Sequence, residues 1–147
     1  MASDIIKRAT DYWSAKRQGS RMPSRPTIDP VDLADVLSNL VVVESIDNGR
    51  DYMHRIAGEQ AETLLGARMH GAKLSGIEGR RAAFASWRNA LNLARTFRAP
   101  HFATFETDDG KGQIRAVFLP LCRREGGEQA DFVLSALIEA ETSRRLR

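Results

Sequence analysis

The first thirty residues combine a helical hydrophobic pattern with a proline-rich connection. Over residues 4–17, apolar side chains recur at helical spacing, which predicts an amphipathic helix. Gly19 ends this pattern, and Pro23 and Pro26 predict an extended segment, because the residue before a proline disfavours helical backbone. The apolar positions of the predicted helix are Ile5, Ile6, Ala9, Tyr12 and Trp13.

A second helix is predicted to begin at residue 29. Asp29 is a favourable N-cap residue, and Pro30 occupies the first helical position, where its missing N–H costs nothing. Ile28 and Leu33 flank this start at the spacing of a hydrophobic staple. One apolar face of the helix is predicted to consist of Leu33, Val36, Leu37 and Leu40.

The pattern then changes to that of strands. Residues 40–43 are continuously apolar and mostly β-branched, which predicts a strand at 40–46 that is covered on both faces. Asn48-Gly49 predicts a tight turn into a returning strand at 52–57, because both residues accept positive φ. A short helix at 58–65 is predicted to follow.

The second half of the chain predicts one long helix and three strands. Residues 67–78 are read as a loop with one turn of helix, and apolar spacing predicts a helix at 79–97. Glycine-containing turns at 109–112 and 125–127 predict antiparallel hairpins. The predicted strands are 101–107, 113–122 and 131–140.

These elements predict an α+β domain with a five-stranded antiparallel sheet. We divide the chain into an N-terminal helical extension (1–38) and a core domain (39–142). The long helix can cover only one face of the sheet, so we expect the helix at 4–17 to cover the other. That cover can come from a second copy in a homodimer, which we expect, or from the same chain in a monomer.

Composition limits the function further. The chain has 147 residues, enough for one domain, with a formal charge of +3 and basic residues scattered among acids. This distribution predicts no nucleic-acid binding. No apolar run is long enough to cross a membrane, and the N-terminus lacks the apolar core of a signal peptide, so we expect a cytoplasmic protein. Cys122 is the single cysteine and is expected to be buried and inert.

Several short motifs, in order along the chain, resemble the signature of a PAS-domain family typical of alphaproteobacteria. They are Tyr12-Trp13, Pro23-Ser24-Arg25, Asp29-Pro30, Arg55-Ile56-Ala57-Gly58 and Phe118-Leu119-Pro120-Leu121. The resemblance implies a bacterial PAS fold with added N-terminal helices and a role in signal transduction rather than catalysis. It transfers no ligand or catalytic residue. His54 stands where an aromatic residue is expected in that pattern.

Six residues are candidates for a ligand pocket between the sheet and the long helix: His54, Arg55, Phe84, Trp87, Phe102 and Phe118. For the aromatic residues, ordinary core packing is the favoured alternative. Arg55 lies in an apolar strand and would be costly to bury without a partner, so a structural ion pair is favoured over ligand recognition. The expected partner is Asp29, Asp32 or Glu44.

Two further groups are candidates for contacts with a partner protein. Arg81, Arg88 and Arg95 recur every seven residues and therefore share one side of the predicted helix, where a solvated face is the favoured alternative. Tyr12 and Trp13 end the apolar stripe of the first helix. The glycine-containing stretch 76–81 could hold phosphate at a helix N-terminus, but a flexible loop is favoured.

The sequence predicts no catalytic or metal site. His54, His70 and His101 lack the close spacing of metal ligands, and no nucleophile lies beside a base. We therefore expect no cofactor, and a colourless, metal-free protein. The function predicted is a non-enzymatic sensory module that binds a signalling partner, with a small apolar ligand as a further candidate. The alternatives are a small α+β enzyme using the same cavity and a nucleic-acid-binding regulator.

Overall fold

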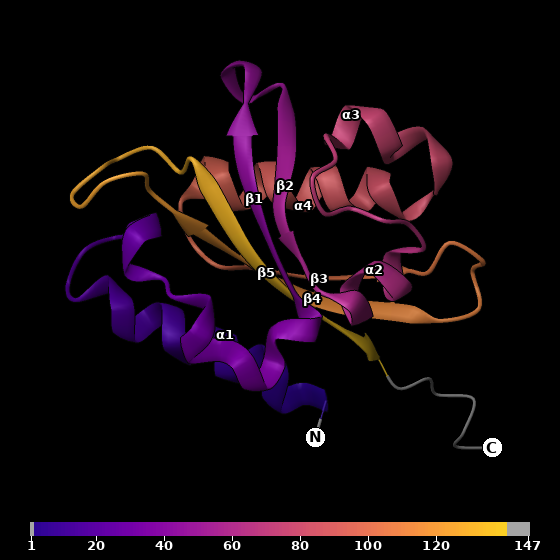
Figure 1. Cartoon of the computed structure of the whole chain (residues 1–147), viewed down its shortest axis with the longest axis horizontal. Helices are drawn as coiled ribbons and strands as arrows, with labels where there is room; N and C mark the ends of the chain where they lie inside the picture. The colour runs from indigo at the N-terminus through magenta and orange to yellow at the C-terminus, as the bar shows by residue number, and fades with distance from the viewer. Residues whose placement is uncertain (1, 141–147) are drawn as a thin grey trace.

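The structure is a computed structural model and describes residues 2–140 (Figure 1). Five antiparallel strands form one sheet, with helices on both of its faces. The α-helices are α1 (Ala2–Arg17), α2 (Glu59–Leu65), α3 (Leu74–Ile77) and α4 (Ala83–Phe97), and the 3-10 helices are η1 (Arg25–Thr27), η2 (Pro30–Asn39), η3 (Asp47–Gly49) and η4 (Glu78–Arg80). The strands are β1 (Leu40–Ile46), β2 (Asp51–Ala57), β3 (His101–Glu106), β4 (Gln113–Leu121) and β5 (Phe132–Ala140).

The sheet confirms the predicted fold class. Its strand order is β2-β1-β5-β4-β3, and each pair of neighbours is antiparallel. The five strands lie where the hydrophobic pattern predicts them, with ends that differ by at most one residue. The hairpin β1–β2 turns through Asp47, Asn48 and Gly49, with φ values of 55°, 55° and 82°. Asn and Gly adopt this left-handed backbone readily, which explains the tight turn.

Both faces of the sheet are buried, as the apolar run at 40–43 predicts. Val41 and Val43 face a core shared with Trp87 on α4. Leu40 and Val42 face a second core shared with Trp13 on α1. Because successive side chains of a strand point to opposite faces, the central strand β1 contributes to both cores.

The helix α1 covers the second face of the sheet within the same chain (Figure 1). Ala9 is completely buried, and Trp13 is 3% exposed and donates its indole N–H to the carbonyl of Pro120 at 2.8 Å. Arg8 and Tyr12 bind the neighbouring segment η2, through Asp35 at 3.2 Å and Asp32 at 2.8 Å. The second face is therefore covered without a second copy, and the homodimer stays a prediction.

The second predicted helix is a 3-10 helix rather than an α-helix. Asp29 is confirmed as its N-cap, because its carboxylate accepts a hydrogen bond from the Val31 N–H at 3.0 Å. A 3-10 helix has three residues per turn, so Leu33 and Val36 both face the core. Leu37, which an α-helix would place on that face, is 36% exposed, so its predicted inward position is wrong.

The long helix begins at Ala83, four residues later than its predicted start, because α3 and η4 occupy residues 74–80. The first turn of α4 lacks a local side-chain cap. Instead, Asp108 from the β3–β4 turn accepts a hydrogen bond from the Ala82 N–H at 2.7 Å. This cap comes from a residue 26 positions away, so hydrophobic spacing alone cannot locate the helix start.

The outer edge of β2 is covered by the segment that follows α2. The Gly71 N–H donates to the carbonyl of His54 at 2.8 Å, and the His54 N–H donates to the carbonyl of Ala72 at 3.0 Å. Met53 and Lys73 form an isolated bridge beside them. This pairing fixes the Ala72 carbonyl against the side chain of His54, where the candidate site lies. Within residues 2–140, no helix is both long and apolar enough to span a membrane.

Candidate functional site

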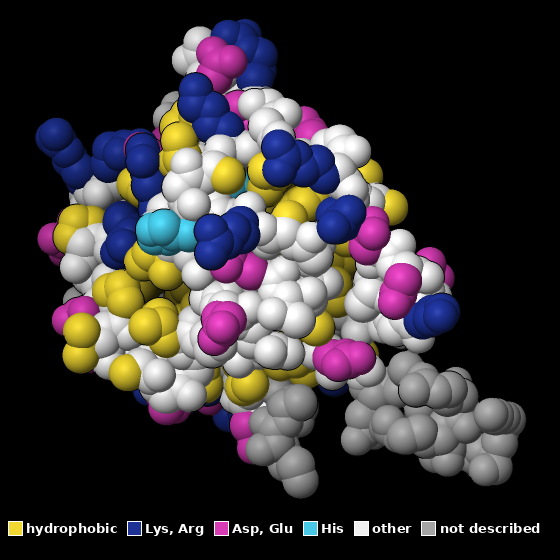
Figure 2. Space-filling view, turned by 45° about the vertical axis from the view of Figure 1, so that its right-hand side comes forward, with side chains coloured by type: hydrophobic (Ala, Val, Ile, Leu, Met, Phe, Trp, Pro, Cys, Tyr) yellow, Lys and Arg dark blue, Asp and Glu magenta, His cyan; other side chains and the backbone are white. Residues whose placement is uncertain are grey.

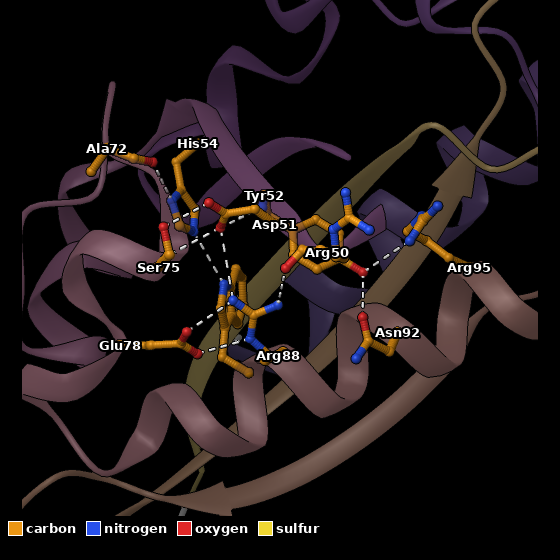
Figure 3. Close-up of polar contacts among 11 residues, drawn as sticks. Arg50, Asp51, Tyr52, His54, Ala72, Ser75, Glu78, Arg88, Asn92 and Arg95 are labelled. Carbon is orange, nitrogen blue, oxygen red and sulfur yellow. Dashed lines mark hydrogen bonds and ion pairs between the residues drawn. The ribbon is translucent and has the colours of Figure 1, made fainter. Parts of the chain in front are cut away.

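A network of polar side chains joins β2 to α4, on the face of the sheet that packs against α4 (Figure 3). β2 contributes Asp51, Tyr52 and His54, which are all buried. The helix α4 lies against them, and the segment 72–78 closes the side of the network. The remaining members are Ala72, Ser75, Glu78, Trp87, Arg88, Asn92 and Arg95.

The environment of His54 fixes its tautomer. Its Nδ1 lies 2.8 Å from the Ala72 carbonyl, which can only accept, so Nδ1 carries the proton. Its Nε2 lies 3.2 Å from the indole nitrogen of Trp87, which can only donate, so Nε2 is unprotonated. Burial lowers the pKa of His54, although the Ala72 carbonyl opposes this shift. His54 is therefore held as a neutral imidazole with both ring nitrogens in use.

Asp51 forms the second buried polar centre. Its carboxylate accepts hydrogen bonds from the backbone N–H groups of Tyr52 at 2.8 Å and Ser75 at 3.0 Å, and from the Ser75 hydroxyl at 2.6 Å. Arg88 lies 3.7 Å away. Burial acts to raise the pKa of Asp51, but these donors and Arg88 together lower it. The group is therefore a fully hydrogen-bonded carboxylate.

Arg88 links three elements. It binds Glu78 through two nitrogens at 2.8 and 2.9 Å and donates to the carbonyl of Arg50 at 3.0 Å. The hydrogen bonds to Glu78, and then the nearby charge of Asp51, raise its pKa. A bidentate guanidinium of this kind has a fixed orientation. Arg88 therefore fastens the middle of α4 to η4 and to the start of β2.

Tyr52 carries the network toward the end of α4. Its hydroxyl donates to Asn92 Oδ1 at 2.6 Å and accepts from Arg95 at 3.3 Å. Burial raises the pKa of Tyr52, and Arg95 opposes this shift. Arg95 in turn donates through Nε to the carbonyl of Ala130 at 2.7 Å. Tyr52 thus connects the core of the sheet to the β4–β5 loop.

The predicted pocket residues separate into a packed core and two surface residues. His54, Phe84, Trp87 and Phe118 are completely buried, and the rings of Trp87 and Phe118 meet edge to face at 5.1 Å between centroids. These side chains fill the space between the sheet and α4, as expected for ordinary core packing, the alternative to a ligand pocket. Phe102 is 60% exposed on the edge strand β3 and lies apart from them.

Arg55 forms the structural ion pair that its position predicts. Its guanidinium binds Glu44 through two nitrogens, at 2.7 and 2.9 Å, on the neighbouring strand β1. Arg123 binds the same carboxylate at 2.8 Å. Burial acts to raise the pKa of Glu44, but the hydrogen bonds and charges of the two arginines lower it. Arg55 is 51% exposed at its side chain, so it lies on the surface beside the sheet.

The three arginines predicted to share a helix side do not form a solvated stripe, so that favoured interpretation is wrong. Arg81 precedes α4 and donates to the carbonyl of Gly66 at 2.8 Å. Arg88 and Arg95 are half-buried and bind the network. Sequence spacing missed this because their partners, Glu78 and Tyr52, come from other elements. Whether any of the three contacts a partner protein stays a prediction, as it does for Tyr12 and Trp13.

The stretch 76–81 lies at the end of α3, in η4 and at the residue after them, and among residues 2–140 the histidines form no metal-ligating group. His54 is buried, His101 is half-buried and His70 is exposed, and no group of metal-ligating side chains occurs in that range. The backbone N–H before α4 is already occupied by Asp108. On the face shown in Figure 2, Lys and Arg side chains are spread over the upper half as separate groups, with acidic side chains among and below them.

Six residues of the network were not predicted as site residues: Asp51, Tyr52, Ala72, Ser75, Glu78 and Asn92. The only available signal was the charged pair Arg50-Asp51 at the start of a strand that becomes apolar. Ser75 and Glu78 lie in a stretch that the sequence pattern describes as a loop. Their roles depend on the packing of that stretch against β2, which no local periodicity encodes.

Comparison with known proteins agrees with this architecture. A family model described as a PAS domain matches residues 1–133. Among solved structures, a sensory box sensor histidine kinase from Vibrio cholerae has a TM-score of 0.50 at 13% identity, covering 77% of this chain and 93% of that one. A PAS domain from Colwellia psychrerythraea has a TM-score of 0.46 at 14% identity, covering 76% and 98%. No curated protein matches the chain significantly in sequence.

The five-stranded antiparallel sheet with helices on both faces is an α+β fold. The chain belongs to the PAS domain family, whose model spans α1 as well as the sheet as far as residue 133. The predicted PAS resemblance is thereby confirmed at the level of the domain. The finer assignment, to the family typical of alphaproteobacteria, stays a prediction.

Proposed function

We propose that this PAS domain is a non-enzymatic sensory and regulatory module of bacterial signal transduction. It acts in the cytoplasm by binding other protein chains, among them a second copy of itself. Membership of the PAS family and the fold shared with a domain of a sensor histidine kinase support this proposal. A small apolar ligand, as the sequence predicts, would require the aromatic core around Trp87 to open, because its side chains are completely buried.

The observation that carries the non-enzymatic part is the saturation of the buried titratable groups. His54 uses both ring nitrogens inside the core, and the carboxylate of Asp51 accepts three hydrogen bonds. A general acid or base must reach a proton on its substrate. These two groups instead hold β2 against α4, which is a structural role suited to transmitting a change in one element to the other.

The test is crosslinking of the full chain in its native host, followed by reconstitution with the purified partner and titration calorimetry. The proposal predicts saturable binding to a defined protein partner. Replacing Glu78 with Gln weakens the attachment of Arg88 to η4 and should change that affinity, whereas Glu59→Gln, on the exposed side of α2, should not. Turnover of a substrate by the purified chain, or salt-dependent binding to DNA as the main interaction, would overturn the proposal.

A further inference from the structure

A depression of about 670 Å³ lies between the β1–β2 turn and the β4–β5 loop, beside the C-terminal end of α4. In Figure 1 the β1–β2 turn lies at the top of the molecule and the β4–β5 loop at the upper left. The walls are formed by Ser45–Gly49 on one side and Glu128–Asp131 on the other, and Arg95 and Arg98 come from α4 and the residue after it. Its volume lies in the range of sites for small molecules, about 300–1,000 Å³.

Arg95 lies at this depression with donors to spare. Its Nε–H binds the Ala130 carbonyl and one Nη1–H binds the Tyr52 hydroxyl, so three of its five N–H groups remain. A Cβ at Gly49 would lie 3.4 Å from Nη1 and 3.6 Å from Nη2, which places the free end of the guanidinium against the β1–β2 turn. The two bound N–H groups fix its orientation. Figure 3 shows the contact with Tyr52.

The charge of this end of α4 is not neutralised by ion pairs. Arg98 donates to the backbone carbonyl of Glu128 at 3.2 Å, and no carboxylate in residues 2–140 pairs with Arg95 or Arg98. By contrast, Arg88, which lies about two turns earlier on the same side of α4, is bound by Glu78 through two hydrogen bonds. A half-buried guanidinium bound only to neutral acceptors retains its affinity for an anion.

The acidic residues of the walls form no ion pair with Arg95 or Arg98 within residues 2–140. Asp47 lies 3.2 Å from Arg50, and Asp131 lies 4.0 Å from Arg123. Glu128 is exposed and offers only its backbone carbonyl to Arg98. The C-terminal end of a helix carries partial negative charge, so the two guanidiniums themselves must supply the attraction.

We propose that this depression binds a small phosphate monoester through Arg95 and Arg98. Two guanidiniums with free N–H donors match the charge and the several acceptor oxygens of a phosphate monoester better than those of a single carboxylate. The inference deepens the proposed sensory function, because it names the chemical class of the signal. Only the interpretation of the bound phosphate monoester as a signal rests on that function. Arg95 also binds Tyr52, so an anion here would contact the network that joins β2 to α4.

The test is titration calorimetry of the full chain with glycerol 3-phosphate, inorganic phosphate and succinate at constant ionic strength. We expect saturable binding of glycerol 3-phosphate, weakened about tenfold or more in Arg98→Asn. Asn accepts the left-handed backbone of position 98, where φ is 52°, so this variant removes the charge without straining the turn. Arg115→Gln, an exposed arginine outside the depression, is the control and should bind as the wild type does.

Further outcomes separate the alternatives. Glu128→Gln should tighten binding, because it removes a negative charge from the wall, and this result supports the site even where Arg98→Asn does not fold. Three results would each overturn the proposal. They are no binding of glycerol 3-phosphate at millimolar concentration, an equal loss of affinity in Arg115→Gln and Arg98→Asn, and tighter binding of succinate than of glycerol 3-phosphate. Binding of inorganic phosphate alone would show a simple anion site and overturn the monoester assignment. Partner binding without any phosphate would leave the proposed function standing.

Discussion

His54 Nε2 accepts a hydrogen bond from the indole N–H of Trp87 at 3.2 Å, between two side chains with no solvent exposure. The two rings are nearly parallel, with 6.3 Å between centroids and 23° between planes. The contact joins β2 to α4 and leaves His54 neutral. Because both partners are buried, loss of either one leaves a polar atom without a hydrogen bond.

Replacing Trp87 with Phe should lower the free energy of unfolding by about 2–3 kcal/mol, from a lost hydrogen bond and a small cavity. Urea denaturation measures this change. The control is Phe97→Leu, because Phe97 is 64% exposed, and it should change stability by less than about 0.5 kcal/mol. Equal effects of the two substitutions would contradict the role given to Trp87.

The neutral state of His54 predicts a pH dependence of stability. Its pKa is lower in the folded chain than in the unfolded one, where it is about 6.5. The stabilisation is therefore complete above about pH 6.5 and decreases as the pH falls below it, by up to about 1.4 kcal/mol per pH unit. Urea denaturation between pH 7.5 and 5 measures the slope.

His54→Gln should flatten this slope, since glutamine does not titrate. His70→Gln is the matched control, because His70 is exposed, and it should keep the wild-type slope. A wild-type slope that survives in His54→Gln would assign the pH dependence to other groups.

Asp51→Asn should destabilise the fold by about 1–3 kcal/mol at pH 7, because an amide cannot accept all the hydrogen bonds that the carboxylate accepts. The pKa of Asp51 is lowered in the folded chain, so its contribution is present above the unfolded-state value of about 3.9 and disappears as the pH falls through the folded one. The difference from the wild type should therefore shrink in strong acid. Glu106→Gln, at an exposed carboxylate on the edge strand β3, should show neither effect.

The homodimer predicts a mass of about twice 16.4 kDa by light scattering. Since the inner side of α1 covers the sheet of its own chain, a dimer contact through α1 would use the exposed side of this helix. Ala15→Glu places a charge on that side and should shift the mass toward one chain, whereas Ala85→Glu, on the exposed side of α4, should not. Deletion of residues 1–20 tests the same point, although it also uncovers the second core.

A dimer that persists in Ala15→Glu, or in a folded chain lacking residues 1–20, would exclude α1 as the dimer element. A mass of one chain at all concentrations would exclude the homodimer altogether.

The fold could be predicted largely because its signals are local. Asn48 and Gly49 specify a tight turn by their backbone preferences, and the apolar run at 40–43 specifies a strand covered on both faces. The start of α4 could not be predicted, because its cap is Asp108, which folding brings from another turn. The 3-10 geometry of η2 also escaped prediction, since three- and four-residue spacings are nearly indistinguishable over one turn.

The candidate site was predictable only in part. The sequence pattern identified His54, a polar residue within an apolar strand, and Trp87, a member of the apolar stripe of the long helix. It could not show that they bind each other, since they are 33 residues apart and on different elements. Glu78 has no local signal, and the signal for Asp51 is limited to the charged pair Arg50-Asp51. The importance of both carboxylates comes from Arg88, which folding places between them.

Native mass spectrometry of the full chain, freshly purified from its host, tests the central claim that the domain acts by binding other chains. The same spectrum reports assembly, stoichiometry and any retained small molecule. The account predicts a stoichiometric complex with a second copy or with a signalling protein. A single chain free of any protein partner, over the whole range of concentrations at which it occurs in the host, would contradict it.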